Sequence, residues 1–155
     1  MAVRSASATG ITIGPSQGGK PSNRYTNFTN ATASTHNTAS LTMGGFGSSW
    51  ALTPSSTGRV RVLITGYINN SAVGGAVFTP RYGTGAAPVA TAAVTGTAPI
   101  TTDYAVTATT ATVPFTIYYE VTGLTLATAY WFDIAARNTT ATTTMSPTTI
   151  MIEEF

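Results

Sequence analysis

Between Val113 and Val121 the sequence alternates apolar and other side chains with a period of two residues. The odd positions hold Val, Phe, Ile, Tyr and Val, whereas Pro, Thr, Tyr and Glu occupy the even positions. Successive side chains of a β-strand point to opposite faces of a sheet, so this spacing predicts a strand with one buried face. No segment of ten residues carries apolar side chains at helical spacing, which argues against a fold built on helices.

The same period recurs along the chain. Clear alternation occurs at 59–69, 130–137 and 150–155, and weaker alternation at 40–43, 48–53, 76–82, 103–109 and 141–145. Short strands separated by turn residues predict an all-β fold, an antiparallel β-sandwich. Jelly-roll-like connections and immunoglobulin- or fibronectin-III-like connections give the same alternation, so the pattern leaves the connectivity open. We interpret residues 86–102, rich in Ala and Thr, as a long exposed loop.

Residues 1–38 differ in composition from the rest of the chain. They are rich in Ser, Thr, Gly and Asn and lack a sustained period, so we expect an extended N-terminal arm over 1–38 and the sandwich domain over 39–155. Spaced apolar anchors on such an arm suit docking on a neighbouring subunit, although a free tail is an equal alternative. The anchors are Ile11, Ile13, Tyr25 and Phe28.

The composition excludes several classes of function. Charged residues make up only 8% of the chain and 33 of its 155 residues are threonine, so little charge repulsion opposes association with partners. The net charge is +2 and the basic residues are scattered, which argues against nucleic-acid binding. The chain has no cysteine, no signal-peptide pattern and no apolar run long enough to cross a membrane. We therefore expect a protein made in the cytoplasm and not secreted.

The residues that carry acid–base chemistry are few, and we expect no catalytic site, cofactor or metal. The one histidine, His36, lies among Ser and Thr without a motif that would orient a catalytic triad. Glu120 and Asp133 both lie on the polar side of their predicted strands, so we expect them to be neighbours. A glycosidase needs such a pair in one cleft, but an ion pair of Arg61 with either carboxylate is the favoured interpretation.

The same polar side also carries Tyr67, Tyr118 and Trp131. Large aromatic side chains on an exposed face usually contact a partner, so we interpret these three as partner-contact residues. The partner is another subunit or a stacked glycan. The alternative is that the fold buries this face within itself.

Two resemblances bear on the fold and function. Thr122-Gly123-Leu124-Thr125, followed by Ala129-Tyr130-Trp131-Phe132 and Ala136-Arg137-Asn138, resembles the tyrosine-corner region of fibronectin type III domains. Leu126 stands where that family usually has proline, and the resemblance covers only the last third of the chain. We interpret it as convergence between β-sandwiches.

The second resemblance covers roughly residues 40–155. Its turn and core motifs are Gly58-Arg59-Val60 through Gly66, Tyr82-Gly83-Thr84-Gly85 with Pro88, Thr95-Gly96-Thr97, Pro114-Phe115, Thr122-Gly123-Leu124, Tyr130-Trp131-Phe132-Asp133 and a terminal Ile-x-Ile-Glu. In these motifs the chain is similar to a β-sandwich domain of tailed-bacteriophage virion proteins. The resemblance implies a jelly-roll-like fold, homo-oligomers that are often trimers, and a structural or host-contact role. It carries no catalytic residues.

These expectations combine into one functional hypothesis and one alternative. The hypothesis is a non-enzymatic virion protein that decorates or cements the capsid, with the major capsid protein or other virion subunits as partners. The alternative is a receptor-binding module of a tail fibre or spike that grips a host glycan through Trp131, Tyr118 or the loop at 83–102. Neither involves nucleic acid or a membrane.

Overall fold

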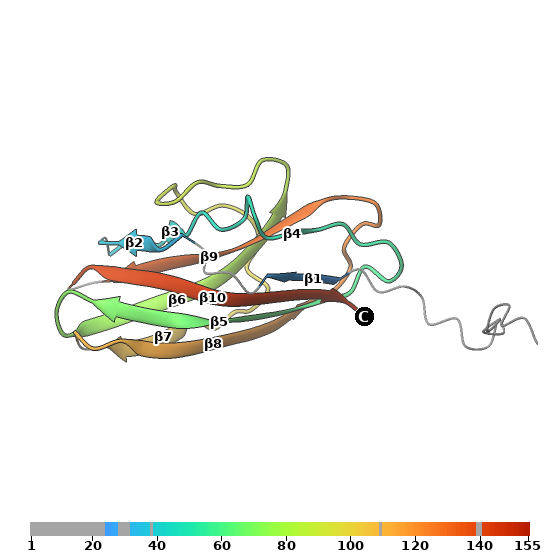
Figure 1. Ribbon diagram of the computed structural model, residues 1–155. Coiled ribbons are helices and arrows are strands. Elements are labelled where there is room, and N and C mark those ends of the chain that lie inside the picture. The colour runs from blue at the N-terminus through green and yellow to red at the C-terminus, as the bar shows by residue number, and fades with distance from the viewer. Residues whose placement is uncertain (1–23, 28–31, 38, 109, 139–140) are drawn as a thin grey trace, which may run out of the picture.

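The protein is a sandwich of two antiparallel β-sheets. The computed structural model describes residues 24–27, 32–37, 39–108, 110–138 and 141–155, and no helix occurs among them (Figure 1). Two five-stranded sheets pack face to face. The predicted all-β antiparallel sandwich is therefore confirmed.

We name the two sheets A and B. The strands of sheet A are β1 (Arg24–Asn27), β2 (Ser34–His36), β5 (Val60–Asn70), β8 (Val113–Val121) and β10 (Thr143–Glu154). The strands of sheet B are β3 (Thr42–Met43), β4 (Ala51–Leu52), β6 (Gly74–Thr84), β7 (Tyr104–Ala108) and β9 (Tyr130–Asn138).

The strand order is that of a jelly roll. In sheet A, β10 lies between β5 and the consecutive short strands β1 and β2, and β8 lies on the far side of β5. In sheet B, β9 lies between β6 and the consecutive short strands β3 and β4, and β7 lies beyond β6. The first half of the chain thus pairs with the second half like one long hairpin wrapped over two sheets. Immunoglobulin-like folds pair their last two strands, whereas β9 and β10 lie in different sheets, so that alternative is wrong.

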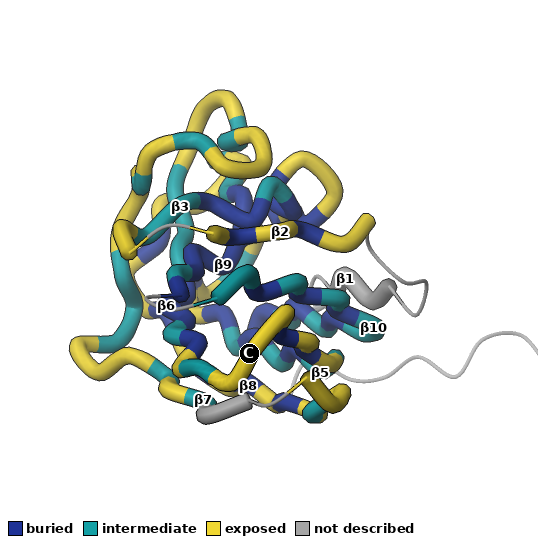
Figure 2. The backbone as a smooth tube through the Cα atoms, turned by 90° about the vertical axis from the view of Figure 1, so that its left-hand side faces the viewer, coloured by how far each residue is buried: buried dark blue, intermediate teal, exposed yellow. Residues whose placement is uncertain are grey.

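The core lies between the sheets and follows the predicted alternation. On β8 the apolar side chains of Phe115, Ile117 and Tyr119 are buried, and those of Thr116 and Tyr118 are exposed. The tube in Figure 2 shows the same change between buried and exposed positions along the central strands. Side chains from both sheets fill the core, including Val62, Ile64, Ile150 and Ile152 from sheet A and Phe78, Phe132 and Ile134 from sheet B.

The predicted boundary between arm and sandwich is too late in the sequence. Residues 24–27 and 34–36 form β1 and β2, which both pair with β10. Sequence periodicity missed them because each strand is short and because β2 buries the polar side chains of Ser34 and His36. The backbone of Tyr25 pairs with that of Ile152. Three predicted docking anchors lie outside the described residues, namely Ile11, Ile13 and Phe28.

Residues 86–102 form a loop between strands, as predicted, and most of its residues are exposed, but part of it also packs on the protein. We call residues 85–103, which connect β6 to β7, the strap. It crosses the outer face of sheet B, where Ala93 bridges to Thr42 and Thr97 bridges to Tyr82. The strap covers Met43, Trp131 and Ala135 with the apolar side chains of Ala87, Ala92 and Val94. The regular Ala and Thr composition hid this packing, because it resembles that of a free linker.

Gly96 lets the strap approach Trp131. Gly96 has a φ of +75°, and a Cβ there would lie 2.4 Å from Cη2 of Trp131 and 2.6 Å from the carbonyl oxygen of Tyr82. Gly85 has nearly the same backbone conformation, with a φ of +78°, but a Cβ there would meet nothing within 4 Å. A side chain at Gly85 would introduce backbone strain alone, whereas a side chain at Gly96 would introduce strain and a steric clash. Comparing the two substitutions therefore separates these effects.

We expect Gly96→Ala to lower the free energy of unfolding by about 2 to 4 kcal/mol, because strain and overpacking add. The matched Gly85→Ala should cost about 1 kcal/mol from strain alone. Chemical denaturation measures both values. Hydrogen exchange at the Thr97 amide, which donates to the carbonyl of Tyr82 at 2.8 Å, should accelerate only in Gly96→Ala. Equal effects of the two substitutions would contradict tight strap packing.

Glu154 at the end of β10 holds the loop before β5. Its buried carboxylate accepts hydrogen bonds from the backbone N–H groups of four consecutive residues, 55 to 58. Burial would raise the pKa of Glu154, but the four backbone donors together outweigh it and hold the pKa well below its usual range. The neighbouring Glu153 forms a surface ion pair with Arg61 instead.

We expect Glu154→Gln to destabilise the protein by about 2 kcal/mol, because the loop amides lose a charged acceptor. The matched Glu153→Gln should cost less than about 1 kcal/mol, as is typical of exposed ion pairs. Because the folded-state pKa of Glu154 is lowered, its contribution is present at neutral pH and disappears as the pH falls below about 4.3. Urea denaturation at pH 7 and pH 3 measures this, and an unchanged difference between wild type and Glu154→Gln at pH 3 would contradict it.

Candidate functional site

The two sheets differ in what covers their outer faces. The strap covers sheet B, so Trp131 is only 5% exposed and its indole Nε1 donates to the carbonyl of Thr84 at 3.2 Å. Tyr67 and Tyr118 lie instead on the outer face of sheet A, where they are 38% and 49% exposed. The prediction that Trp131 shares an exposed patch with the two tyrosines is wrong, because the strap buries it and the sandwich core separates it from them.

The outer face of sheet A presents side chains from β5, β8 and β10, all half-buried or exposed. We call this surface the open face. It consists of Arg61, Leu63, Thr65, Tyr67 and Asn69 of β5, Pro114, Thr116, Tyr118 and Glu120 of β8, and Thr144, Ser146, Thr149, Met151 and Glu153 of β10.

The strand register arranges the open face in rows across the three strands. Leu63 pairs with Tyr118 on one side and Met151 on the other, which makes an apolar row. The next row along the strands contains Thr116, Thr65 and Thr149. The row beyond it centres on Tyr67, which pairs with Pro114 and Ser146. An apolar and aromatic surface therefore lies on both sides of a threonine row.

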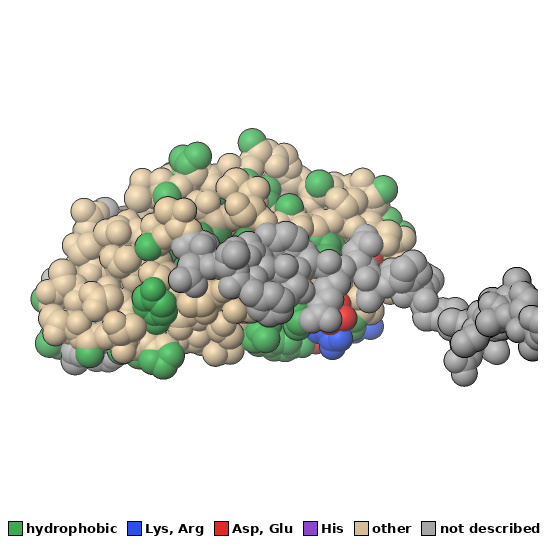
Figure 3. Space-filling model, viewed as in Figure 1, with side chains coloured by type: hydrophobic (Ala, Val, Ile, Leu, Met, Phe, Trp, Pro, Cys, Tyr) green, Lys and Arg blue, Asp and Glu red, His purple; other side chains and the backbone are tan. Residues whose placement is uncertain are grey.

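The charges of the open face gather at one end. Arg61 forms an ion pair with Glu153 at 3.0 Å, and its guanidinium also lies 5.3 Å from the centre of the Phe155 ring. Glu120 accepts a hydrogen bond from the hydroxyl of Tyr118 at 2.6 Å, which raises the pKa of Tyr118. Figure 3 shows blue and red side chains near the end of β10 and few elsewhere in that view. The predicted ion pair of Arg61 with Asp133 or Glu120 is wrong, because Glu153 takes that position.

Asp133 is a structural carboxylate. It lies on sheet B, fully buried, and accepts hydrogen bonds from the backbone N–H groups of Gly45, Phe46 and Ile134. Burial raises the pKa of Asp133 to about 6, although these backbone donors act in the opposite direction. Glu120 is exposed on sheet A, so the two carboxylates share no cleft. The expectation that they are neighbours is wrong.

His36 is also enclosed by the fold. Its Nδ1 lies 2.7 Å from the hydroxyl oxygen of Thr42 and its Nε2 lies 3.0 Å from that of Ser34. Both Ser34 and His36 are buried, so this pair of residues is closed to a substrate. Burial lowers the pKa of His36 to about 4, which keeps the ring neutral at physiological pH.

Neutral His36 predicts a loss of stability in mild acid. Its folded-state pKa lies below its unfolded value of 6.5, so stability is complete at pH 7 and falls as the pH drops through 6.5 towards 4. We expect a loss of about 1 kcal/mol by pH 5.5. The His36→Gln variant should lack this loss, and comparing it with wild type cancels the opposite contribution of Asp133. Urea denaturation from pH 7 to 5.5 measures it, and parallel profiles would contradict a neutral buried His36.

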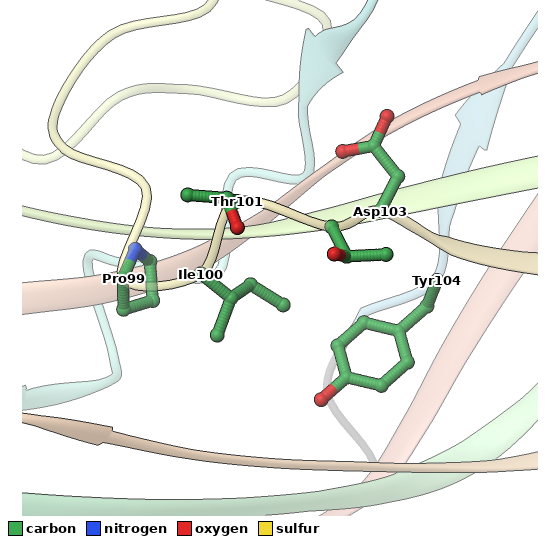
Figure 4. Close-up of a pocket in the computed structure, with 6 residues that line it drawn as sticks. Pro99, Ile100, Thr101, Asp103 and Tyr104 are labelled. Atoms are coloured by element: carbon green, nitrogen blue, oxygen red, sulfur yellow. The ribbon is translucent and has the colours of Figure 1, made fainter.

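Two of the hollows on the surface of the described residues bear on binding. The larger, of about 500 Å³, is lined by residues 99–104 (Figure 4). Figure 4 shows Ile100 and Tyr104 pointing to the same side and Asp103 pointing away, where it accepts from the hydroxyl of Thr79. The hydroxyl of Tyr104 donates to the carbonyl of Tyr118 across the edge of the sandwich at 2.9 Å. The smaller hollow, of about 310 Å³, lies beside Trp131.

The larger hollow has an apolar wall and hydroxyl groups but no facing acid–base pair. Pro99, Ile100 and Tyr104 supply the wall, and Thr101 and Thr102 supply the hydroxyls. Such a lining suits a small group with one apolar face, such as a sugar ring. Within the described ranges no three His, Cys, Asp or Glu side chains gather where they would hold a metal ion. No helix long and apolar enough to cross a membrane occurs in the same ranges.

Sequence reasoning missed part of this surface. Leu63 and Met151 belong to the open face, but an apolar residue on the polar side of an alternating strand matches neither the pattern of the core nor that of the aromatic contacts. The register between β5 and its two neighbours is the signal that aligns them with Tyr118. No family model, curated protein or solved structure matches the chain.

Proposed function

We propose that this chain is a non-enzymatic virion protein that decorates or cements the capsid of a tailed bacteriophage. The observation that carries the proposal is the open face of sheet A. It is a broad surface whose charges gather at one end and which exposes two tyrosines, while the strap covers the equivalent surface of sheet B. A surface of this kind is used by burial against another protein.

The polar side chains of the fold support a structural role. His36, Asp133 and Glu154 are buried, and their hydrogen bonds hold backbone or neighbouring hydroxyl groups in place. These three side chains, which acid–base chemistry could otherwise use, are thereby engaged in holding the fold. The mechanism is then area burial, at about 25 cal/mol for each Å² of apolar surface removed from water.

The jelly roll is a further support, by analogy. Viral capsid proteins use this architecture, although the fold alone also serves lectins and enzymes. The resemblance of the turn and core motifs points to virion proteins, and it implies a homo-oligomer, often a trimer. Other virion subunits, the major capsid protein first among them, are the proposed partners, and the virion is the proposed location.

The test is binding of the purified protein to assembled phage capsid shells. We expect cosedimentation with the shells and a regular array of density on them in cryo-electron microscopy. Tyr118→Ser should weaken binding at least tenfold, because it removes a large exposed ring from the open face. Val73→Ser is the matched control, because Val73 is 70% exposed but lies in the turn after β5. Shells that stay bare would contradict the proposal.

One observation favours a second candidate, a receptor-binding module for a host glycan. The hollow at residues 99–104 joins an apolar wall to two threonine hydroxyls, as a sugar subsite would. This moves the expected glycan contact away from Trp131, which is buried, to one end of the predicted loop. Binding on a glycan array that is lost in Ile100→Asp, with bare shells, would favour this candidate.

A further inference from the structure

We propose that the open face binds the open face of a second copy of this chain, around a two-fold axis in the interface. The axis runs across the strands, through the row of Thr65, Thr116 and Thr149. This inference rests on the proposed function, because it concerns the same binding surface and names a second copy of the chain as its partner. The second copy and the capsid shell then compete for the open face, and the dimer replaces the trimer that the resemblance implies. The pairing is back to back, with the two straps on the outer sides of the dimer.

The rows of the open face are self-complementary around this axis. Leu63 and Tyr67 lie two residues to either side of Thr65 on β5, so the rotation places Leu63 over the partner's Tyr67. On β8, Tyr118 and Pro114 lie two residues to either side of Thr116 in the same way. Each apolar row therefore meets the aromatic row of the other copy, and threonine meets threonine.

The charges favour this axis over a two-fold axis parallel to the strands. An axis parallel to the strands of β5 would place Arg61 over the partner's Arg61, and Glu120 over the partner's Glu153, according to the register. Like charges in contact destabilise an interface. The axis across the strands instead places Arg61 over the partner's Asn69, which is four residues along from Thr65 in the opposite direction. The ion pair of Arg61 with Glu153 then stays at the rim.

The size of the open face fits a weak, specific dimer. Its five rows span roughly 30 Å along β5, and its three strands span roughly 15 to 20 Å, from the usual rise and spacing of strands. Each copy then buries about 500 Å², or about 1,000 Å² for the pair, which is close to the lower limit for a specific interface. We expect a concentration-dependent equilibrium between monomer and dimer.

Analytical ultracentrifugation of the full chain, from about 1 to 500 μM, tests the pairing. Wild type should form dimers as the concentration rises. Leu63→Arg and Tyr67→Glu should each weaken the dimer at least tenfold, since both lose packing in the interface. The double variant should regain dimerisation, because each Arg then faces the partner's Glu. Within one copy these two positions are about 13 Å apart, too far for an internal ion pair. Val73→Arg is the exposed control and should dimerise like wild type.

The outcomes separate this inference from the proposed function. A monomer across the whole concentration range, as when residues 1–23 of the same chain occupy the face, would overturn the pairing. A trimer, or a double variant that stays monomeric while circular dichroism shows it folded, would overturn it too. Wild-type monomers that coat capsid shells would overturn only the dimer. Dimers that leave shells bare would support the pairing and contradict the capsid role.

Discussion

The pairing of β10 with β5 is the constraint on which the rest of the structure depends. The two strands align over eleven residue pairs, interrupted by one irregularity between Pro147 and Thr149. Odd-numbered residues of β10 are buried before the irregularity and even-numbered residues are buried after it. The extra residue therefore keeps the same face of the strand against the core along its whole length. The same register brings Glu154 under the loop at 55–58 and aligns the rows of the open face. Core packing, loop anchoring and the exposed surface thus share one alignment.

Buried carboxylates support the irregular segments of the fold alongside the apolar core. Leaving a buried donor or acceptor unpaired costs free energy, so each such group needs a partner. Glu154 and Asp133 pair with backbone donors of irregular segments, since one carboxylate accepts hydrogen bonds from several N–H groups where no neighbouring strand is present. These acids are few and buried, which explains how a chain with so little charge still positions its loops.

Sequence patterns predicted the alternation that repeats along the strands and missed the contacts that occur only once in the fold. The alternation on β5 and β8 predicted the sandwich and its buried residues because each position is supported by its neighbours two residues away. The burial of Trp131 depends on the strap, which lies far from it in sequence and contacts it through Gly96 and small side chains. No local pattern reports such a contact. Likewise, Arg61 has glutamates on both neighbouring strands, and only side-chain geometry decides that Glu153 is its partner.

The strap also determines how far association can proceed. A sandwich with two bare faces can stack on itself without limit, as subunits joined through unlike surfaces grow into open filaments. Here the strap covers the outer face of sheet B over Met43, Trp131 and Ala135, whereas the open face of sheet A is half-buried or exposed. In the proposed pairing the open face meets the second copy, and the strap separates the strands of sheet B from any further copy. The strap therefore limits face-to-face stacking to two copies in this arrangement.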